Sequence, residues 1–483
     1  MSPTKVSTIL IIFMSCTGTY CNEVERQTAL GAVSGRKLNV LNTIVEEYVG
    51  IPYAKPPVGD LRFMPPVPME PWEGTYNATQ TRTGCPQIPF PGLWAGEVTY
   101  TEDCLHLNVW TSHPPMNDSE ASAPVLAWIH GGGFCYGSAA YDNYTGSILA
   151  AKTGYVVVSM NYRLGVLGFM DARFPGAPGN MGLMDQNLAL RWIQKNARFF
   201  GGDPAKVTLF GESAGAMSIN CHLLSPMSEG LFARAVLLSG TMYTIDFYDT
   251  PEESFEKAEK LAERVGCKER ELNLTTHPEQ IISCLRRIPG DEITRAAFAM
   301  TEPKTLPFLP TYRNEYLPQE PRLALDNGLF LPVDVIVGVV SDEMSVIFLF
   351  PPVYDFLQEN LEGLERDNVT SFLEKVIGSL VKSALPETLD NYLARAKDVS
   401  RGALVRQYLD YSSDRVFNCP TRYFERKHAS GGGKVFSYVF NHKYHTPALP
   451  SWMGTPHSLE LPLLFGFPLV ADTNFGGRAP CDE

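Results

Sequence analysis

The sequence is short of positive charge and of long apolar runs. Its 40 lysines and arginines are outnumbered by 53 aspartates and glutamates, which gives a net charge of −13 at pH 7. Because a surface of this sign repels phosphate backbones, nucleic acid is not an expected partner. After the first 20 residues no run of about 18 apolar residues occurs, so no membrane-spanning helix is predicted there. Internal repeats and low-complexity linkers are also lacking, and the 483 residues fit one large domain.

The first 20 residues have the layout of a secretory signal peptide. Lys5 supplies the positive start, and residues 6–16 (VSTILIIFMSC) form an apolar run of suitable length. The small residues Thr17, Gly18 and Thr19 suit cleavage. The alternative is a buried N-terminal helix. We therefore expect a secreted, extracellular protein whose mature domain spans residues 21–483.

Two further patterns are typical of exported proteins. Five Asn-X-Ser/Thr sequons in polar segments are candidate glycosylation sites: Asn77, Asn117, Asn143, Asn273 and Asn368. The chain also has ten cysteines. Cys85 with Cys104, and Cys267 with Cys284, bracket short polar segments that suit local disulfide loops.

The order of apolar segments predicts an α/β fold with a large, mostly parallel central sheet. Four short runs rich in β-branched residues have the pattern of buried parallel strands: residues 125–129, 155–160, 207–210 and 235–238. Helices are predicted at residues 185–199 and 214–223, and this alternation indicates helices on both faces of the sheet. Residues 245–330 and 351–430 are predicted to be helical and loop insertions over the active site.

Ser213 lies at the centre of the segment Gly211-Glu212-Ser213-Ala214-Gly215, between a predicted strand and a predicted helix. A serine on such a tight turn is the arrangement of a nucleophile elbow. The following helix directs free N–H groups and its positive dipole end toward the site. Glycine and serine often coincide in loops, but the strand and helix on either side make Ser213 a candidate nucleophile.

Residues 130–134 (HGGGF) directly follow the predicted strand 125–129. When serine attacks a carbonyl, N–H donors must stabilise the negative oxygen, and glycines let the backbone approach it closely. We predict that Gly132, Gly133 and Ala214 supply these donors. The alternative is a flexible glycine turn.

These segments resemble the type-B carboxylesterase and cholinesterase family of α/β-hydrolases. The resemblance covers about residues 28–467 and includes these motifs: residues 102–109 (EDCLHLNV), 161–169 (NYRLGVLGF), 179–186 (GNMGLMDQ), 200–204 (FGGDP) and 210–215 (FGESAG). It implies hydrolysis of small-molecule carboxylic esters through an acyl-enzyme. It also implies that the chain needs neither a cofactor nor a metal.

The resemblance supplies two further catalytic candidates. The family's acid is a glutamate in an Asp-Glu-Gly segment after a core strand, and Glu343 matches it, although methionine replaces the glycine here. Asp342 is the alternative acid. The family's base lies in a Gly-X-X-His-X-X-Glu segment, which residues 454–460 (GTPHSLE) fit with His457. The order of Ser213, acid and base is the one the fold requires. We expect activity to fall as the histidine protonates below about pH 6.5.

The same resemblance implies supporting contacts and a shortened C-terminus. Ser239 matches a serine that bonds the acid, and Glu102 with Arg163 matches a structural ion pair. The family continues beyond its histidine with helices that often dimerise, whereas 26 residues follow His457 here. We therefore expect a monomer or weak dimer that lacks these helices. Cys419 matches the first cysteine of a third disulfide.

Two ester classes compete for the substrate. Cholinesterases hold a quaternary ammonium on aromatic faces, and Trp94 matches their choline tryptophan. Against choline, aromatic residues near the family's acid and base are replaced here by Val346 and Leu459. In the acyl-pocket segment 306–308 only Phe308 is aromatic.

We therefore expect a broad carboxylesterase, with a cholinesterase as the alternative. Trp94, Glu212 and Phe308 are the substrate-binding candidates. Glu212 disfavours enzymes that need Gly-Gln-Ser-Ala-Gly, such as juvenile hormone esterases. A neuroligin-like adhesion protein shares the fold but lacks a complete triad, and it is the alternative from another class.

Overall fold

The structure of the chain is a computed structural model. It describes residues 23–80, 83–88, 98–113, 122–243, 247–300, 306–349, 391–392, 394–395, 401–443 and 453–470. The predicted signal peptide, Trp94, Asn117 and Asn368 lie outside these residues, as do most of residues 351–400 in the predicted insertion over residues 351–430.

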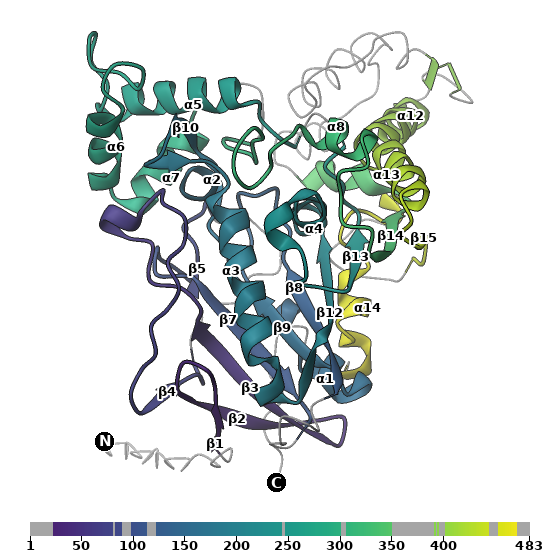
Figure 1. Ribbon diagram of the computed structural model, residues 1–483. Helices are drawn as coiled ribbons and strands as arrows, with labels where there is room; N and C mark the ends of the chain where they lie inside the picture. The colour runs from purple at the N-terminus through teal and green to yellow at the C-terminus, as the bar shows by residue number, and fades with distance from the viewer. Residues whose placement is uncertain are drawn as a thin grey trace, which may run out of the picture.

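The core is one mixed sheet of eleven strands within the described residues (Figure 1). Their order is β1-β2-β3-β7-β9-β8-β12-β13-β14-β15, and β4 pairs with β2. The bounds are β1 (Glu23–Gln27), β2 (Ala32–Val40), β3 (Thr43–Pro52), β4 (Thr75–Asn77), β7 (His106–Thr111), β8 (Ala123–Ile129), β9 (Val156–Met160), β12 (Gly202–Glu212), β13 (Arg234–Leu238), β14 (Asp334–Val340) and β15 (Val435–Phe440). Two small pairs stand apart: β5 (Thr83–Gly84) with β6 (Thr99–Tyr100), and β10 (Asp171–Phe174) with β11 (Ala177–Pro178).

The six strands from β9 to β15 run parallel, as the sequence predicts. The pairs from β1 through β2, β3 and β7 to β9 are antiparallel, and β4 pairs parallel with β2. All five residues of β9 are buried. Its β-branched side chains suit a strand covered on both faces. The carboxyl ends of β8, β12 and β14 lead into the three segments that the sequence marks for catalysis.

Helices cover both faces of the sheet, which confirms the predicted α/β-hydrolase architecture (Figure 1). Their bounds are α1 (Ser147–Thr153), α2 (Gly165–Phe169), α3 (Met181–Asn196), α4 (Ala214–Leu224), α5 (Pro251–Arg264), α6 (Pro278–Arg287), α7 (Gly290–Phe298), α8 (Pro321–Asp326), α12 (Arg401–Ser413), α13 (Cys419–Ser430) and α14 (Leu461–Leu464). All residues of α4 are buried, because it lies against β8, β12 and β13. On the opposite face, Leu461 of α14 and the adjacent Phe465 pack with Trp128 and Phe210.

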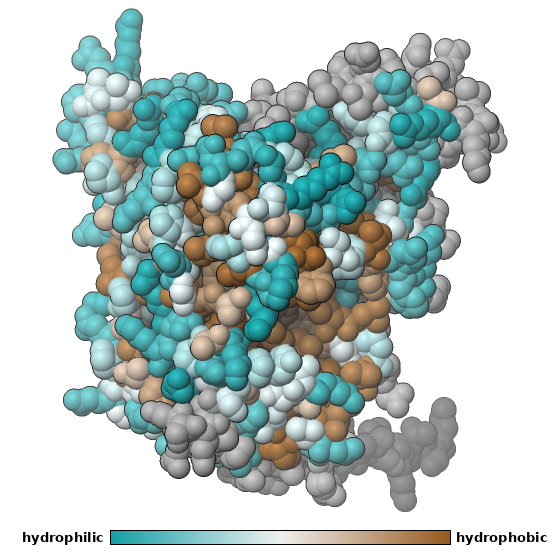
Figure 2. Space-filling view, turned by 45° about the vertical axis from the view of Figure 1, so that its right-hand side comes forward, coloured by the Kyte–Doolittle hydropathy of each residue, from teal (hydrophilic) through white to brown (hydrophobic). Residues whose placement is uncertain are grey.

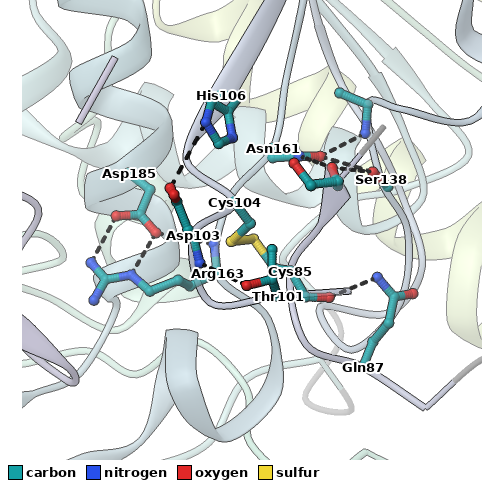
Figure 3. The surroundings of a disulfide bond; sticks show 12 residues. Cys85, Gln87, Thr101, Asp103, Cys104, His106, Ser138, Asn161, Arg163 and Asp185 are labelled. Carbon is teal, nitrogen blue, oxygen red and sulfur yellow. Dashed lines mark hydrogen bonds and ion pairs between the residues drawn. A yellow bond between two sulfur atoms is a disulfide. The ribbon is translucent and has the colours of Figure 1, made fainter. Parts of the chain in front are cut away.

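The predicted insertion over residues 245–330 contains helices α5 to α8. Helix α5 begins with a capping box, in which Thr250 and Glu253 bond each other's backbone N–H groups. The disulfide Cys267–Cys284 joins the end of α5 to α6. The other predicted disulfide, Cys85–Cys104, is also present (Figure 3). Cys419 is a free cysteine within the described part of the chain.

The predicted ion pair between Glu102 and Arg163 is wrong. Arg163 instead pairs with Asp185, through Nε to Oδ2 at 2.8 Å and Nη2 to Oδ1 at 2.7 Å (Figure 3). Glu102 accepts from Arg62 Nε at 2.6 Å. Each carboxylate accepts two hydrogen bonds from one guanidinium, which is the favoured bidentate geometry of arginine–carboxylate pairs.

Apolar side chains gather across the middle of the face seen in Figure 2, with hydrophilic side chains above and below them. At the sheet edge, Ile336 of β14 and Phe436 of β15 are neighbours in register, and they are 44% and 61% exposed.

Across the described ranges, no helix is long and apolar enough to span a membrane.

Candidate active site

Ser213 lies on a strained turn between β12, which ends at Glu212, and α4, which begins at Ala214. Its backbone has φ 55° and ψ −122°, a region that non-glycine residues rarely adopt. The turn is held on both sides, because Ser213 N donates to Leu238 O and Met217 N donates to Ser213 O, each at 2.9 Å. This is the nucleophile-elbow geometry that the sequence predicts.

Two glycines permit this turn to pack closely. A Cβ atom on Gly215 would lie 2.0 Å from Ile129 O at the end of β8. A Cβ atom on Gly240 would lie 2.3 Å from Ser213 O. Both distances are far below van der Waals contact, so a side chain at either position would displace the serine or the sheet.

The glycine segment after β8 flanks the serine. A Cβ atom on Gly131 would lie 3.1 Å from Ser213 Cβ. Gly132 and Gly133 have φ of 108° and 58°, and both are partly exposed, as Ser213 is. Two of the predicted oxyanion donors, Gly132 and Gly133, are therefore partly accessible like the serine, whereas Ala214 is buried.

His130 anchors this segment. Its ring stacks on Tyr162, with centroids 4.4 Å apart, and Tyr162 Oη donates to His130 O at 2.9 Å. Burial lowers the pKa of His130 to about 4. It is therefore a neutral packing residue.

His457 and Glu343 meet directly. Nδ1 of His457 lies 2.6 Å from Glu343 Oε2. The side chain of Glu343 is fully buried, and its Oε1 accepts from Val340 N at 2.9 Å. The carboxylate is thus fixed from two sides and orients the imidazole.

Asp342, the alternative acid, contacts the backbone of the loop that carries His457. Its Oδ2 accepts from Thr455 N at 2.8 Å, and Asp342 N donates to Thr455 O at 3.1 Å. Arg406 of α12 forms an ion pair with Oδ1. Asp342 therefore ties the acid turn to the loop that carries His457.

The second imidazole nitrogen faces Glu212. Nε2 of His457 lies 3.0 Å from Glu212 Oε1, and Ser458 Oγ donates to the same oxygen at 2.6 Å. Within the described residues Ser213 Oγ makes no hydrogen bond. The elbow, acid and base are brought together, with the base paired to the residue before the serine.

Two carboxylates, Glu212 and Glu343, set the charge of His457, and both also act on a third carboxyl, Glu460. Burial lowers the pKa of His457, but the charges and hydrogen bonds of Glu212 and Glu343 outweigh it and raise the pKa well above 6.5. Glu460, unlike an ordinary carboxyl, has a raised pKa that favours its neutral form. Its burial, together with the charges of Glu212 and Glu343, raises its pKa to about 8.

Comparison of the sequence with known proteins shows the family of the chain. A model described as the carboxylesterase family matches residues 22–479. The chain belongs to this family. It is 34% identical to the acetylcholinesterase of Bungarus fasciatus over 498 residues, covering 97% of this chain and 78% of that protein. It is 36% identical to the cholinesterase of Mus musculus over 480 residues, covering 93% of this chain and 74% of that protein.

The motif resemblance is thereby confirmed, and the chain is a carboxylic ester hydrolase. Small-molecule esters are the substrates that this membership implies. In the part of the chain that the structure describes, no group of three or more His, Cys, Asp or Glu side chains could hold a metal ion.

Sequence reasoning gave no role to two side chains near the candidate site, Phe417 and Ser458, and named Leu306 only as part of the acyl-pocket segment 306–308. The Phe417 ring lies 4.7 Å from that of His457, on a π-helix (Asp414–Asn418) between α12 and α13. Leu306 Cδ2 would lie 3.1 Å from a Cβ atom on Gly133. Ser458 follows the histidine with φ 70°. Ser458 had a local signal, its place beside the histidine, whereas Phe417 is brought in by the tertiary fold.

The substrate-binding candidates have different surroundings. Glu212 is 2% exposed and contacts His457. Phe308 is fully buried in the main apolar core. Leu459 is also buried, and Val346 is half-buried.

The predicted bond from Ser239 to the acid is wrong. Ser239 Oγ is buried without a hydrogen-bond partner in the described chain, and Glu343 Oε1 accepts from Val340 N. Among the sequons described, Asn77 is exposed, and Asn143 and Asn273 are partly exposed.

Proposed function

We propose that the chain is a secreted serine carboxylesterase that uses Ser213, His457 and Glu343. The observation that carries this proposal is the 2.6 Å contact between His457 Nδ1 and Glu343 Oε2 beside the elbow of Ser213. A buried carboxylate in this position keeps Nε2 available as the proton acceptor and stabilises the imidazolium. A neuroligin-like protein without a complete triad does not account for it.

The reaction follows from these groups. After its Nε2 proton is lost to solvent, neutral His457 turns Nε2 from Glu212 to Ser213 and takes the Oγ proton as the oxygen attacks the ester carbonyl. The alcohol departs with that proton, which leaves an acyl-enzyme. Water then loses a proton to His457 and attacks the acyl carbon, and the acid product leaves as Ser213 regains its proton.

Backbone N–H groups of Gly132, Gly133 and Ala214 stabilise the negative oxygen in both steps. The position of Ala214 at the start of α4, whose first N–H groups have no helical partners, supports this role. The positive φ of both glycines supports it too, because such a backbone turns N–H groups away from the ordinary direction. Each donor contributes about a hundredfold or more to the rate.

Fluorophosphonate labelling tests the nucleophile. The purified chain should hydrolyse p-nitrophenyl butyrate and take one label, and Ser213→Ala should lose both. Ser430→Ala, at the end of α13, is the matched control and should keep both. Labelling that survives Ser213→Ala would contradict the proposal.

Broad, uncharged esters are the proposed substrate class, with Trp94, Glu212 and Phe308 in the binding site. The aliphatic Leu306 beside Gly133 and the replacement of aromatic residues by Val346 and Leu459 support it. Cholinesterase activity is the second candidate, because both relatives reported above carry that name. Dominant turnover of acetylthiocholine over p-nitrophenyl butyrate would reverse the order.

The last part of the proposal is that the chain is exported from the cell. The signal-like N-terminus, the two disulfides and the exposed Asn77 support an extracellular protein with glycans on its sequons. Expression in secreting cells should deliver the chain to the medium with a mass that falls on glycan removal. Light scattering should show a monomer or weak dimer, and retention in the cytosol would contradict secretion.

A further inference from the structure

Ser458 occupies an unfavourable backbone conformation next to the base. Its φ of 70° lies in the left-handed region, where glycine is the usual residue. The conformation directs its hydroxyl onto Glu212, and Oγ donates to Oε1 at 2.6 Å. Strain of this kind persists only where surrounding contacts fix it, and it is often found at functional sites.

One carboxylate oxygen therefore serves two donors. Glu212 Oε1 receives both Ser458 Oγ at 2.6 Å and His457 Nε2 at 3.0 Å. Glu212 is 2% exposed, so little water is available to donate further hydrogen bonds to its carboxylate. A hydrogen bond from the hydroxyl satisfies part of the negative charge and leaves less of it to hold the imidazole.

The other groups around His457 do not replace this hydroxyl. Glu343 binds the opposite nitrogen, Nδ1. Burial raises the pKa of Glu460 to about 8, and burial also raises the pKa of Tyr144 and of Tyr438. All three are therefore uncharged at pH 7. Phe417 contributes an apolar ring.

We propose that Ser458 is a positioning residue, whose hydroxyl weakens the hold of Glu212 on His457 so that Nε2 turns to Ser213. This role rests on the triad proposed above. Without the hydroxyl, His457 is the remaining side-chain donor to Glu212 Oε1 within the described site. The imidazolium then persists to higher pH, and a protonated base accepts no proton from the serine.

A pair of variants separates the hydroxyl from the backbone strain. Ser458→Ala removes the hydroxyl and keeps a side chain at positive φ, whereas Ser458→Gly removes both. In each, the acidic limb of kcat/KM on p-nitrophenyl butyrate should move up by about half to one pH unit. Activity at pH 7 should fall several-fold and recover at higher pH. Ser458→Gly keeps the test valid if the alanine variant does not fold.

The partner is tested in a Glu212→Gln background. There the Ser458 substitutions should leave the pH profile of the single Gln variant unmoved, because the charge they act on is gone. Unmoved profiles in the native background, a loss equal at all pH values, or a shift that survives Glu212→Gln would each overturn the role of Ser458. Absence of turnover and of fluorophosphonate labelling in the unmodified chain would instead reject the proposed function.

Discussion

His457 Nε2 lies 3.0 Å from Glu212 Oε1, so the nitrogen that accepts the serine proton in the proposed mechanism is held by the residue that precedes the serine. A histidine between two carboxylates favours its charged form. The two carboxylates thus hold the imidazole in place and favour its protonated form, so the proposed mechanism requires its release from Glu212.

The first prediction is a displaced pH profile. Since the charges of Glu212 and Glu343 raise the pKa of His457 well above 6.5, against the effect of burial, the acidic limb of kcat/KM should lie above pH 6.5. The sequence alone led us to expect about 6.5. Rates on an uncharged ester between about pH 5 and 9 measure the limb, and Glu212→Gln should lower it by about one unit or more. A limb at or below 6.5 would contradict this reading.

What the sequence predicts well is what is local in the chain. The elbow at Ser213, the loop of His457 and the acid turn each lie within a few residues, so their motifs carry the geometry. The contact between Ser458 and Glu212 joins residues 246 positions apart, and Phe417 reaches the site from a π-helix. Such contacts depend on how α12 and the histidine loop pack on the sheet, which no short motif encodes.

The errors have the same origin. Glu102 and Arg163 both belong to recognised motifs, but their partners, Arg62 and Asp185, are chosen by the tertiary fold. Arg163 Nη1 also donates to Met64 O, so the arginine bridges three separate segments. A list of charged residues does not distinguish this pairing from the one expected.

A second prediction concerns that buried pair. Asp185 is fully buried, and its loss leaves the guanidinium of Arg163 without a counter-charge. Asp185→Ala should lower the free energy of unfolding by about 3–5 kcal/mol. Asp291→Ala is the matched control, because its pair with Arg295 is exposed and contributes about 0–1 kcal/mol. Urea unfolding measures both, and similar losses would contradict the argument.

A third prediction follows from Glu460, whose pKa burial raises to about 8 in the fold, from an ordinary 4.5. Between these values the folded chain keeps a proton that the unfolded chain releases, so stability falls as pH rises through this range. Glu460→Gln has no such proton. Its Tm should match that of the unmodified chain near pH 4.5 and exceed it by several degrees at about pH 8–9. Parallel Tm curves across this range would count against a raised pKa.

The last prediction concerns Asp342, which binds the backbone of the histidine loop. Its neighbour Glu343 binds the imidazole ring of His457. Asp342 Oδ2 accepts from Thr455 N, two positions before His457, and a Cβ atom on Gly454 would lie 2.3 Å from the same oxygen. Asp342→Ala removes the acceptor and the partner of Arg406. Misplacing a catalytic group by about 1 Å costs up to about a hundredfold in rate.

For Asp342→Ala we therefore expect kcat on p-nitrophenyl butyrate to fall by about tenfold or more. KM should change little, because the described contacts of the Asp342 carboxylate are to the histidine loop, to Arg406 and to Ser341 Oγ, and none is to Ser213. Asp342→Asn keeps an oxygen that accepts from Thr455 N, so its loss should be clearly smaller. Equal losses in the two variants would mean that the ion pair with Arg406, rather than the bond to the loop, positions the base.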